Sequence, residues 1–256
     1  MGKLAFRRAG TGPALLLLHG VGLDGSVWAP QVAHFRVTHD VVVPDMLGHG
    51  GSDLPPEQPE LADYSDAVLA LMDELGIAQA AVVGHSMGAM LALDLALRHP
   101  GRVSRVVAMN AVFRRSPAQR AAVEARAASL EGVGEAASSA ATIARWFGDP
   151  IPPALQDSAV LLRDLLARVD REGYARTYRL FARIDEAHAA ALPGLAMPAL
   201  FLTGEHDPNS TPAMSQAMAA LAPRGRAEVL AGERHMMAMA APALVNESLA
   251  RFLGER

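Results

Sequence analysis

Ser86 lies in the segment GHSMG, residues 84–88, which fits the pattern G-x-S-x-G. An apolar run, Ala80 to Val83, precedes the segment, and apolar residues at helical spacing follow it. In a sharp turn from strand to helix, flanking glycines remove side chains that would collide with either element, and the serine hydroxyl projects above the sheet. The segment therefore predicts a nucleophilic serine, with His85 pointing away from the point of attack. A serine that only caps the helix is the alternative interpretation.

An acid and a base follow the serine in the order that this chemistry needs. A serine hydroxyl is a poor nucleophile at neutral pH, so it requires a base, and the base requires an orienting partner. In folds with this elbow, the partners lie at the ends of later strands in the order acid, then histidine. Asp207 follows the apolar run Pro198 to Leu202, and His235 follows the run Ala227 to Leu230. We therefore predict that Asp207 and His235 complete a catalytic triad with the serine.

Other residues compete for these roles. Glu205 is the main competitor for the acid, and the strand expected over Val103 to Met109 is followed by Asn110 rather than by an acid. Of the nine histidines, His19 and His49 lie in glycine-rich loops near the site, where we expect structural hydrogen bonds.

A tetrahedral intermediate on the serine needs two backbone donors. One is expected to be the N–H of Met87, at the start of the helix. The other is expected from the loop HGVG, residues 19–22, where glycines let the backbone approach a ligand and where we name Val21. An ordinary tight turn is the alternative for this loop.

The elements that must position these residues alternate between buried strands and helices. This alternation predicts an α/β fold with a mostly parallel sheet and helices on both faces. The strands are expected at Leu4 to Arg8, Ala14 to Leu18, Val37 to Val43, Ala80 to Val83, Val103 to Met109, Pro198 to Thr203 and Ala227 to Leu230.

The alternation stops between residues 112 and 191, a segment rich in Ala and Arg with a helical pattern. We predict a core domain over residues 1–111 and 192–256, with residues 112–191 forming a helical cap over the carboxyl ends of the strands. A separate helical domain elsewhere is the alternative. Trp146, Phe147 and Tyr178 are candidates for a substrate pocket, although the helical spacing of Tyr174, Tyr178 and Phe181 is equally what core packing would produce.

The composition excludes several classes of function. The chain of 256 residues has a formal net charge of −4, a pI near 6.1 and scattered arginines, so a nucleic-acid partner is not expected. It contains no cysteine, which excludes disulfides, thiolate catalysis and cysteine-ligated metal. No His, Asp and Glu cluster has ligand spacing, and we expect neither a metal nor a cofactor.

No segment approaches the ~20 apolar residues of a membrane span. The apolar run that follows two N-terminal arginines covers only Ala14 to Leu18, and we interpret it as a strand rather than a signal sequence. We therefore expect a cytoplasmic location, a small-molecule substrate and no membrane partner. The sequence leaves the oligomeric state open.

Five segments together resemble those of the α/β-hydrolase superfamily, in the same order and spacing. They are HGVG at residues 19–22, PDMLGHGGSD at 44–53, GHSMG at 84–88, GEHDP at 204–208 and GERH at 232–235. The resemblance covers nearly the full chain and implies an α/β-hydrolase fold with a cap and no cofactor. Trp146 and Phe147, with the segment DPNSTP at residues 207–212, are similar to 3-oxoadipate enol-lactonases and related small-ester and lactone hydrolases.

The resemblance implies hydrolysis of a small carboxylic ester or lactone through an acyl-enzyme on Ser86. Carbon–carbon bond hydrolysis, peracid formation and cofactor-free dioxygenation can use the same triad and are alternatives. A non-catalytic ligand receptor on the same fold is the alternative from another class. A serine at the elbow argues against haloalkane dehalogenases, which use aspartate there.

Overall fold

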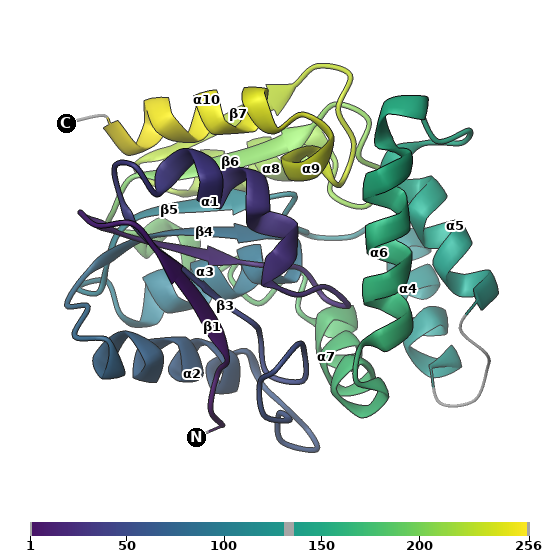
Figure 1. The fold of residues 1–256 in the computed structure, drawn as a ribbon, viewed down its shortest axis with the longest axis horizontal. Coiled ribbons are helices and arrows are strands. Elements are labelled where there is room, and N and C mark those ends of the chain that lie inside the picture. The colour runs from purple at the N-terminus through teal and green to yellow at the C-terminus, as the bar shows by residue number, and fades with distance from the viewer. Residues whose placement is uncertain (1, 131–135, 255–256) are drawn as a thin grey trace.

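The computed structural model describes residues 2–130 and 136–254. Within them the strands form one seven-stranded sheet in the order β1-β3-β2-β4-β5-β6-β7 (Figure 1). β1 pairs antiparallel with β3 at one edge, and the other strand pairs are parallel. The strands are β1 (Phe6–Ala9), β2 (Ala14–Leu18), β3 (Asp40–Pro44), β4 (Ala80–His85), β5 (Val103–Met109), β6 (Ala199–Gly204) and β7 (Gly225–Leu230). The predicted mostly parallel sheet is confirmed.

Helices cover both faces of the sheet, because its central strands are apolar on both sides. In β2, Leu15 and Leu17 join one buried cluster, and Leu16 and Leu18 join the other, since successive side chains of a strand face opposite sides. The cluster around Leu16 contains side chains from α2 (Leu61–Glu74), α3 (Met87–Arg98) and α8 (Pro212–Leu221), whereas the cluster around Leu15 contains side chains from α1 (Ala29–Phe35) and α10 (Pro242–Gly254). Over the described residues, no helix combines the length and apolar character that a membrane span requires.

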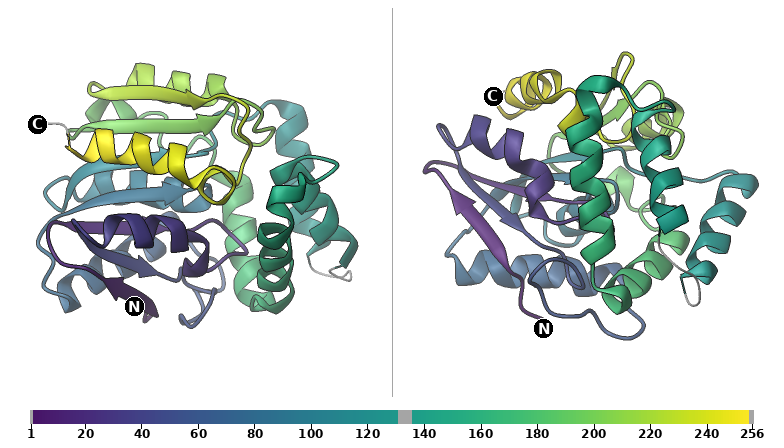
Figure 2. Two further views of the ribbon diagram at one scale, coloured as in Figure 1. Left: turned by 45° about the horizontal axis from the view of Figure 1, so that its top comes forward. Right: turned by 45° about the vertical axis from the view of Figure 1, so that its right-hand side comes forward.

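A helical region is inserted between β5 and β6. It contains α4 (Pro117–Ser129), α5 (Ala136–Phe147), α6 (Gln156–Arg168) and α7 (Arg171–Arg183). Two short 3₁₀ helices, Pro153–Leu155 and Leu192–Gly194, belong to the same stretch. Figure 2 shows this helical insertion beside the end of the sheet to which the parallel strands point. The tract from Ala118 to Ala144, for which the sequence predicts helix interrupted at Gly132 and Gly134, falls partly outside the described residues.

The two ends of the helical insertion are joined to each other. The main-chain N–H of Arg114 donates to the carbonyl oxygen of Asp185 at 2.9 Å, and the N–H of Arg115 donates to its Oδ2 at 2.8 Å. The Arg115 guanidinium also donates to the carbonyl oxygens of Phe181 and Ala182, at 3.1 and 3.2 Å. The first and last parts of the insertion are therefore held together by the buried side chains of Arg115 and Asp185. The domain limits at residues 111/112 and 191/192 stay a prediction.

The structure differs most from the sequence prediction at β3 and at a helix after β7, whereas the bounds of the other strands differ by at most two residues. β3 begins at Asp40 rather than at Val37, because the N–H groups of Thr38 and His39 both bond to the Phe35 carbonyl oxygen and continue the turn that ends α1. Val37 is accordingly 77% exposed. A short helix, α9 (Met237–Ala240), follows the predicted base and has no counterpart in the predicted elements.

Candidate active site

Ser86 lies at the turn between β4 and α3 with φ 56° and ψ −115°, a conformation that is costly for a residue other than glycine. The turn is closely packed on both sides. A Cβ atom at Gly84 would collide with the carbonyl of Gly88, and a Cβ atom at Gly88 would collide with the carbonyl of Leu18. Glycine is required at both positions, and this explains the G-x-S-x-G pattern in physical terms.

His235 and Asp207 meet at the carboxyl ends of adjacent strands. Asp207 follows β6 and His235 follows β7, and both side chains are buried. The Nδ1–H of His235 donates to Oδ2 of Asp207 at 2.7 Å. Because the carboxylate only accepts, Nδ1 carries the proton and Nε2 of the neutral ring keeps its lone pair. Ser86 follows β4, which is separated from β6 by β5 alone.

The carboxylate of Asp207 is held by three further donors. Asn110 donates through Nδ2 to Oδ2 at 2.8 Å, and the N–H groups of Asn209 and Ser210 donate to Oδ1 at 2.8 and 3.2 Å. Burial alone would raise the pKa of Asp207, but the charge and hydrogen bond of His235 and the donors of Asn110 and Asn209 outweigh it, and the pKa is lowered. The group stays ionised and fixed in orientation.

Asn110 is a residue whose contact sequence reasoning missed. It directly follows β5, is fully buried and has φ 51°. Its carbonyl oxygen accepts from Ser210 Oγ at 2.7 Å, so it is joined to the loop of Asp207 through main chain and side chain. The available signal was its position at the end of a strand next to β6, where the sequence shows an amide in place of an acid.

His85, which the sequence predicts to point away from the point of attack, has a specific partner. Its Nε2–H donates to the main-chain carbonyl oxygen of His235 at 2.9 Å, and the two ring centroids are 4.9 Å apart. Burial, and then the neighbouring His235 ring, lower the pKa of His85 to about 3, so the ring is neutral. The residue before the elbow serine therefore holds the main chain of the predicted base.

The loop that carries Val21 lies directly beside Ser86. A Cβ atom at Gly20 would come within 3.2 Å of the Ser86 Cβ. Met87 is the first residue of α3, and the first N–H groups of a helix have no partner within the helix. Both named donor segments thus flank the serine. That the N–H groups of Val21 and Met87 hold an oxyanion stays a prediction.

Two buried histidines fasten this loop to the segment after β3. His19 Nε2 accepts from the N–H of Met46 at 2.9 Å, and His49 Nε2 accepts from the N–H of Gly22 at 2.9 Å. Burial lowers the pKa of His19 to about 4 and that of His49 to about 3. Both rings are therefore neutral acceptors, which is the structural role expected for them.

The three pocket candidates from the insertion have different surroundings. The Trp146 indole is stacked over the His235 imidazole, with centroids 5.9 Å apart and planes inclined by 25°. Phe147 is buried in the cluster that also contains Trp146. Tyr178 contacts the rings of Tyr174 and Phe181, at centroid distances of 5.7 and 5.8 Å. Of these three side chains, Trp146 is the one whose ring contacts the predicted triad, and substrate contact by all three stays a prediction.

Tyr174 joins the insertion to the loop of Val21. A Cβ atom at Gly22, which has φ 80°, would lie 2.9 Å from Tyr174 Cε2. Arg126 donates through Nη2 to the Tyr174 hydroxyl at 3.3 Å, and its guanidinium lies 5.7 Å from the Tyr178 ring centroid. Burial acts to lower the pKa of Arg126, but the two tyrosines outweigh it and the pKa is raised. The Tyr174 side chain therefore lies between the Arg126 guanidinium and this loop.

Glu205, the competitor for the acid, has a different environment from Asp207. Its side chain is half exposed, and its Oε2 accepts from the N–H of Gly232 at 2.8 Å. The carboxylate that bonds to His235 is that of Asp207.

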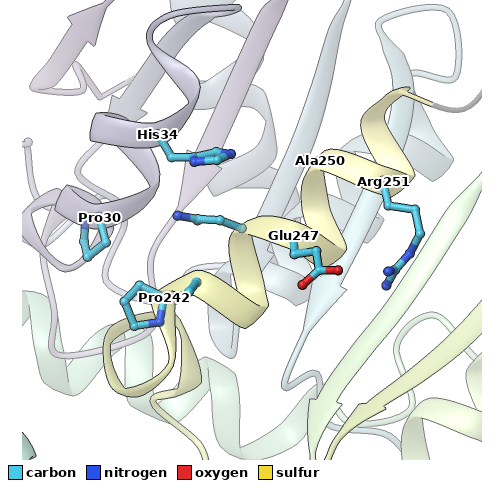
Figure 3. Close-up of a pocket in the computed structure, with 8 residues that line it drawn as sticks. Pro30, His34, Pro242, Glu247, Ala250 and Arg251 are labelled. Carbon is cyan, nitrogen blue, oxygen red and sulfur yellow. The ribbon is translucent and has the colours of Figure 1, made fainter.

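Two further features bear on ligands. An open groove runs between α1 and α10, and all of its lining residues come from these two helices, including Pro30, His34, Pro242 and Glu247 (Figure 3). It is therefore distinct from the strand ends that carry the predicted triad.

In the part of the chain that the structure describes, no group of three or more His, Asp and Glu side chains has a metal-binding arrangement.

Comparisons with known proteins agree with the fold. A family model described as alpha/beta hydrolase fold matches residues 13–242. The (E)-2-((N-methylformamido)methylene)succinate hydrolase of Acinetobacter baylyi is 34% identical over 244 residues, which are 95% of this chain and 91% of that protein. The 3-oxoadipate enol-lactonase 2 of the same organism is 32% identical, over 80% of this chain and 75% of its own length. The crystal structure of the enol-lactonase from Burkholderia xenovorans superposes with a TM-score of 0.92 at 30% identity, covering 99% of this chain and 97% of that one.

Proposed function

The chain belongs to the α/β-hydrolase fold family, and we propose that it is a cofactor-free serine hydrolase that cleaves a small carboxylic ester or lactone. The observation that carries the proposal is the 2.7 Å hydrogen bond from His235 to Asp207, made at the same edge of the sheet at which the strained Ser86 follows β4. The relatives named as enol-lactonases support the lactone part of the proposal.

In the first half of the reaction, Ser86 Oγ attacks the carbonyl carbon while His235 Nε2 takes its proton. Asp207 keeps the ring oriented and stabilises the imidazolium through Nδ1–H. The N–H groups of Val21 and Met87 hold the negative oxygen of the tetrahedral intermediate. His235 then gives its proton to the departing oxygen, and an acyl group remains on the serine. For a lactone, the departing oxygen stays attached to that acyl group.

In the second half, water replaces the leaving group. His235 Nε2 takes a proton from the water as it attacks the acyl carbon, and the same proton returns to Ser86 Oγ when the intermediate collapses. The products are a carboxylic acid and an alcohol, or one hydroxy acid from a lactone. Asp207 remains a carboxylate throughout, which its lowered pKa supports.

In this proposal, residues 112–191 act as a cap domain over a core formed by residues 1–111 and 192–256. Trp146, Phe147 and Tyr178 of the cap contribute to the substrate pocket. The arrangement that supports this is the position of the helical insertion beside the carboxyl ends of the strands (Figure 2). A cap at that place excludes water and strengthens the hydrogen bonds around the reacting carbonyl.

We further propose that the substrate carries a carboxylate apart from the bond that is cleaved. The two curated relatives are named for derivatives of succinate and of 3-oxoadipate, both of which are dicarboxylic acids. Arg126 supplies a matching cation, because it bonds to Tyr174, which contacts the loop of Val21 at Gly22. The positive charge of a guanidinium attracts a carboxylate.

Cleavage of a bond to nitrogen is a second candidate function. It is favoured by the relative whose named substrate carries an N-methylformamido group, which matches 95% of this chain. The same residues would act, with His235 giving its proton to nitrogen instead of oxygen. Hydrolysis of p-nitrophenyl acetate compared with p-nitroacetanilide separates the two candidates, since only the leaving atom differs.

Labelling with a fluorophosphonate tests the proposal at the level of the nucleophile. We expect one adduct per chain, located on Ser86 by peptide mass spectrometry, and no adduct after Ser86→Ala or in unfolded protein. His235→Gln is expected to slow the labelling strongly, because the hydroxyl loses its base. Folded protein that forms no adduct would contradict the proposal and favour a non-catalytic ligand receptor.

A further inference from the structure

The contact between Trp146 and His235 places two buried rings face to face. Their centroids are 5.9 Å apart, their planes are inclined by 25°, and the two residues are 9% and 3% exposed. Two residues further along, a side chain at Gly148 would come within 3.1 Å of Arg234 Nε. The end of α5 therefore lies against the loop that carries the base.

From this geometry we propose that Trp146 is a positioning residue whose indole face stabilises the imidazolium form of His235, so that the cap strengthens the base. The inference rests on the proposed function, in which His235 takes the proton of Ser86. A cation within about 6 Å of the centroid of an indole is attracted by the negative face of the ring. A neutral imidazole lacks that attraction, so the contact favours proton uptake.

The two titratable groups that contact the His235 ring, Asp207 and His85, keep their charge while that ring titrates. Asp207 on the opposite edge stays a carboxylate, because its pKa is lowered, and His85 stays neutral, because burial lowers its pKa to about 3. Arg234 in the same loop and Arg145, next to the indole on α5, are cations throughout. A change confined to the indole therefore reports on the stacking alone.

Fluorinated tryptophans make that change. Fluorine withdraws electron density from the indole face and weakens its attraction for a cation, while the ring keeps its shape. The chain is prepared with tryptophan and with its mono-, di- and trifluorinated analogues, and proton uptake by ¹⁵N-labelled His235 is followed by NMR, with His235→Gln as the assignment reference. We expect the titration midpoint to fall stepwise, by about half a pH unit or more over the series.

The second tryptophan of the chain provides the control. Trp28 lies edge-on to His85, at a centroid distance of 6.5 Å. A Trp146→Phe chain labelled in the same way carries the analogues at Trp28 alone, and its His235 midpoint is expected not to respond to fluorination. An equal response in both chains, or no response in the native chain, would overturn the inference.

Turnover of esters and lactones by the same preparations separates this inference from the proposed function. We expect the acid limb of kcat/KM to move with the NMR midpoint. Turnover with an unmoved midpoint would overturn the inference and leave the proposed function standing. A midpoint that follows fluorination in folded protein without any turnover would support the stacking and overturn the proposed function.

Discussion

Asn110 and His235 donate to the same oxygen of Asp207, Oδ2, from Nδ2 at 2.8 Å and from Nδ1 at 2.7 Å. The amide keeps the carboxylate turned toward the imidazole without adding a charge. An acid at position 110 would instead place a second negative charge beside Asp207 and raise the pKa of the pair. The amide at the end of β5 is therefore suited to support an acid at the end of β6.

Two substitutions of Asn110 separate the effect of this hydrogen bond on activity from the effect of the backbone strain on stability. Asn110→Gly and Asn110→Ala both remove the donor, and we expect kcat/KM to fall about tenfold to hundredfold in each, as for a lost hydrogen bond to a charged group. Glycine accepts φ 51° at no steric cost, whereas alanine at this φ should lower the free energy of unfolding by about 1 kcal/mol more. Steady-state kinetics and urea unfolding of both variants check this. Native kcat/KM in the glycine variant would show that the amide does not position Asp207.

His85 allows a conservative test of how the main chain of His235 is held. His85→Gln keeps an N–H donor for the His235 carbonyl oxygen, whereas His85→Leu removes it and leaves a buried acceptor without that donor. We expect kcat to be close to native in the glutamine variant and about tenfold lower in the leucine variant, with KM less affected. Equal kcat in the two variants would mean that the ring only fills space.

The fold class and the three residues of the predicted triad are predictable from signals that are local in the sequence. The fold class was predictable because buried strands and helices alternate, and that prediction is confirmed. Ser86, Asp207 and His235 are predictable because each follows a strand, at a turn with its own local pattern. Their catalytic roles stay predictions.

The contacts that surround these residues were not predictable, because they join segments far apart in the chain. Asn110 reaches Asp207 only because β5 and β6 are paired in a register that aligns Met109 with Leu202. The stacking of Trp146 on His235 depends on how α5 packs against the loop after β7, which no periodicity in either segment reveals.

Buried neutral histidines predict a loss of stability in acid. Burial lowers the pKa of His19 to about 4 and of His49 and His85 to about 3, from an ordinary value of 6.5. As the pH falls below about 6.5, the unfolded chain takes up these protons before the folded chain does. The contribution of the three histidines to the free energy of unfolding is therefore complete above that pH. Below it, the contribution of each histidine falls by about 1.4 kcal/mol per pH unit until the pKa of the folded state is reached.

Variants at two of these positions measure the contribution of single histidines. His19→Gln and His49→Gln keep an acceptor for a backbone N–H and do not titrate. Between pH 6.5 and 4, each should therefore reduce the slope of the free energy of unfolding against pH by the contribution of one proton. His34→Asn, at an exposed position on α1, is the matched control and should leave the slope unchanged. Urea unfolding at a series of pH values gives the slopes, and native slopes in both glutamine variants would contradict the interpretation.

Arg126 predicts a preference for acidic substrates. The test compares a p-nitrophenyl ester whose acyl group ends in a carboxylate with the neutral ester of equal length. Arg126→Met should lower kcat/KM about tenfold or more for the acidic ester alone. Arg163→Met, at an exposed position on α6, is the matched control and should keep the native ratio of the two values. An equal loss for both esters would assign Arg126 to the packing of the cap rather than to substrate recognition.

Hydrolysis by the native chain and by Ser86→Ala tests the central claim most directly. Release of p-nitrophenol from acetate through octanoate esters, and acid release from a set of lactones in a pH-stat, are measured for both proteins. We expect turnover of at least one compound by the native chain and a decrease in kcat of roughly three orders of magnitude or more in the variant, as loss of a triad nucleophile implies. Folded native protein that is inert to every compound, or a variant that keeps the native rate, would contradict an acyl-enzyme on Ser86.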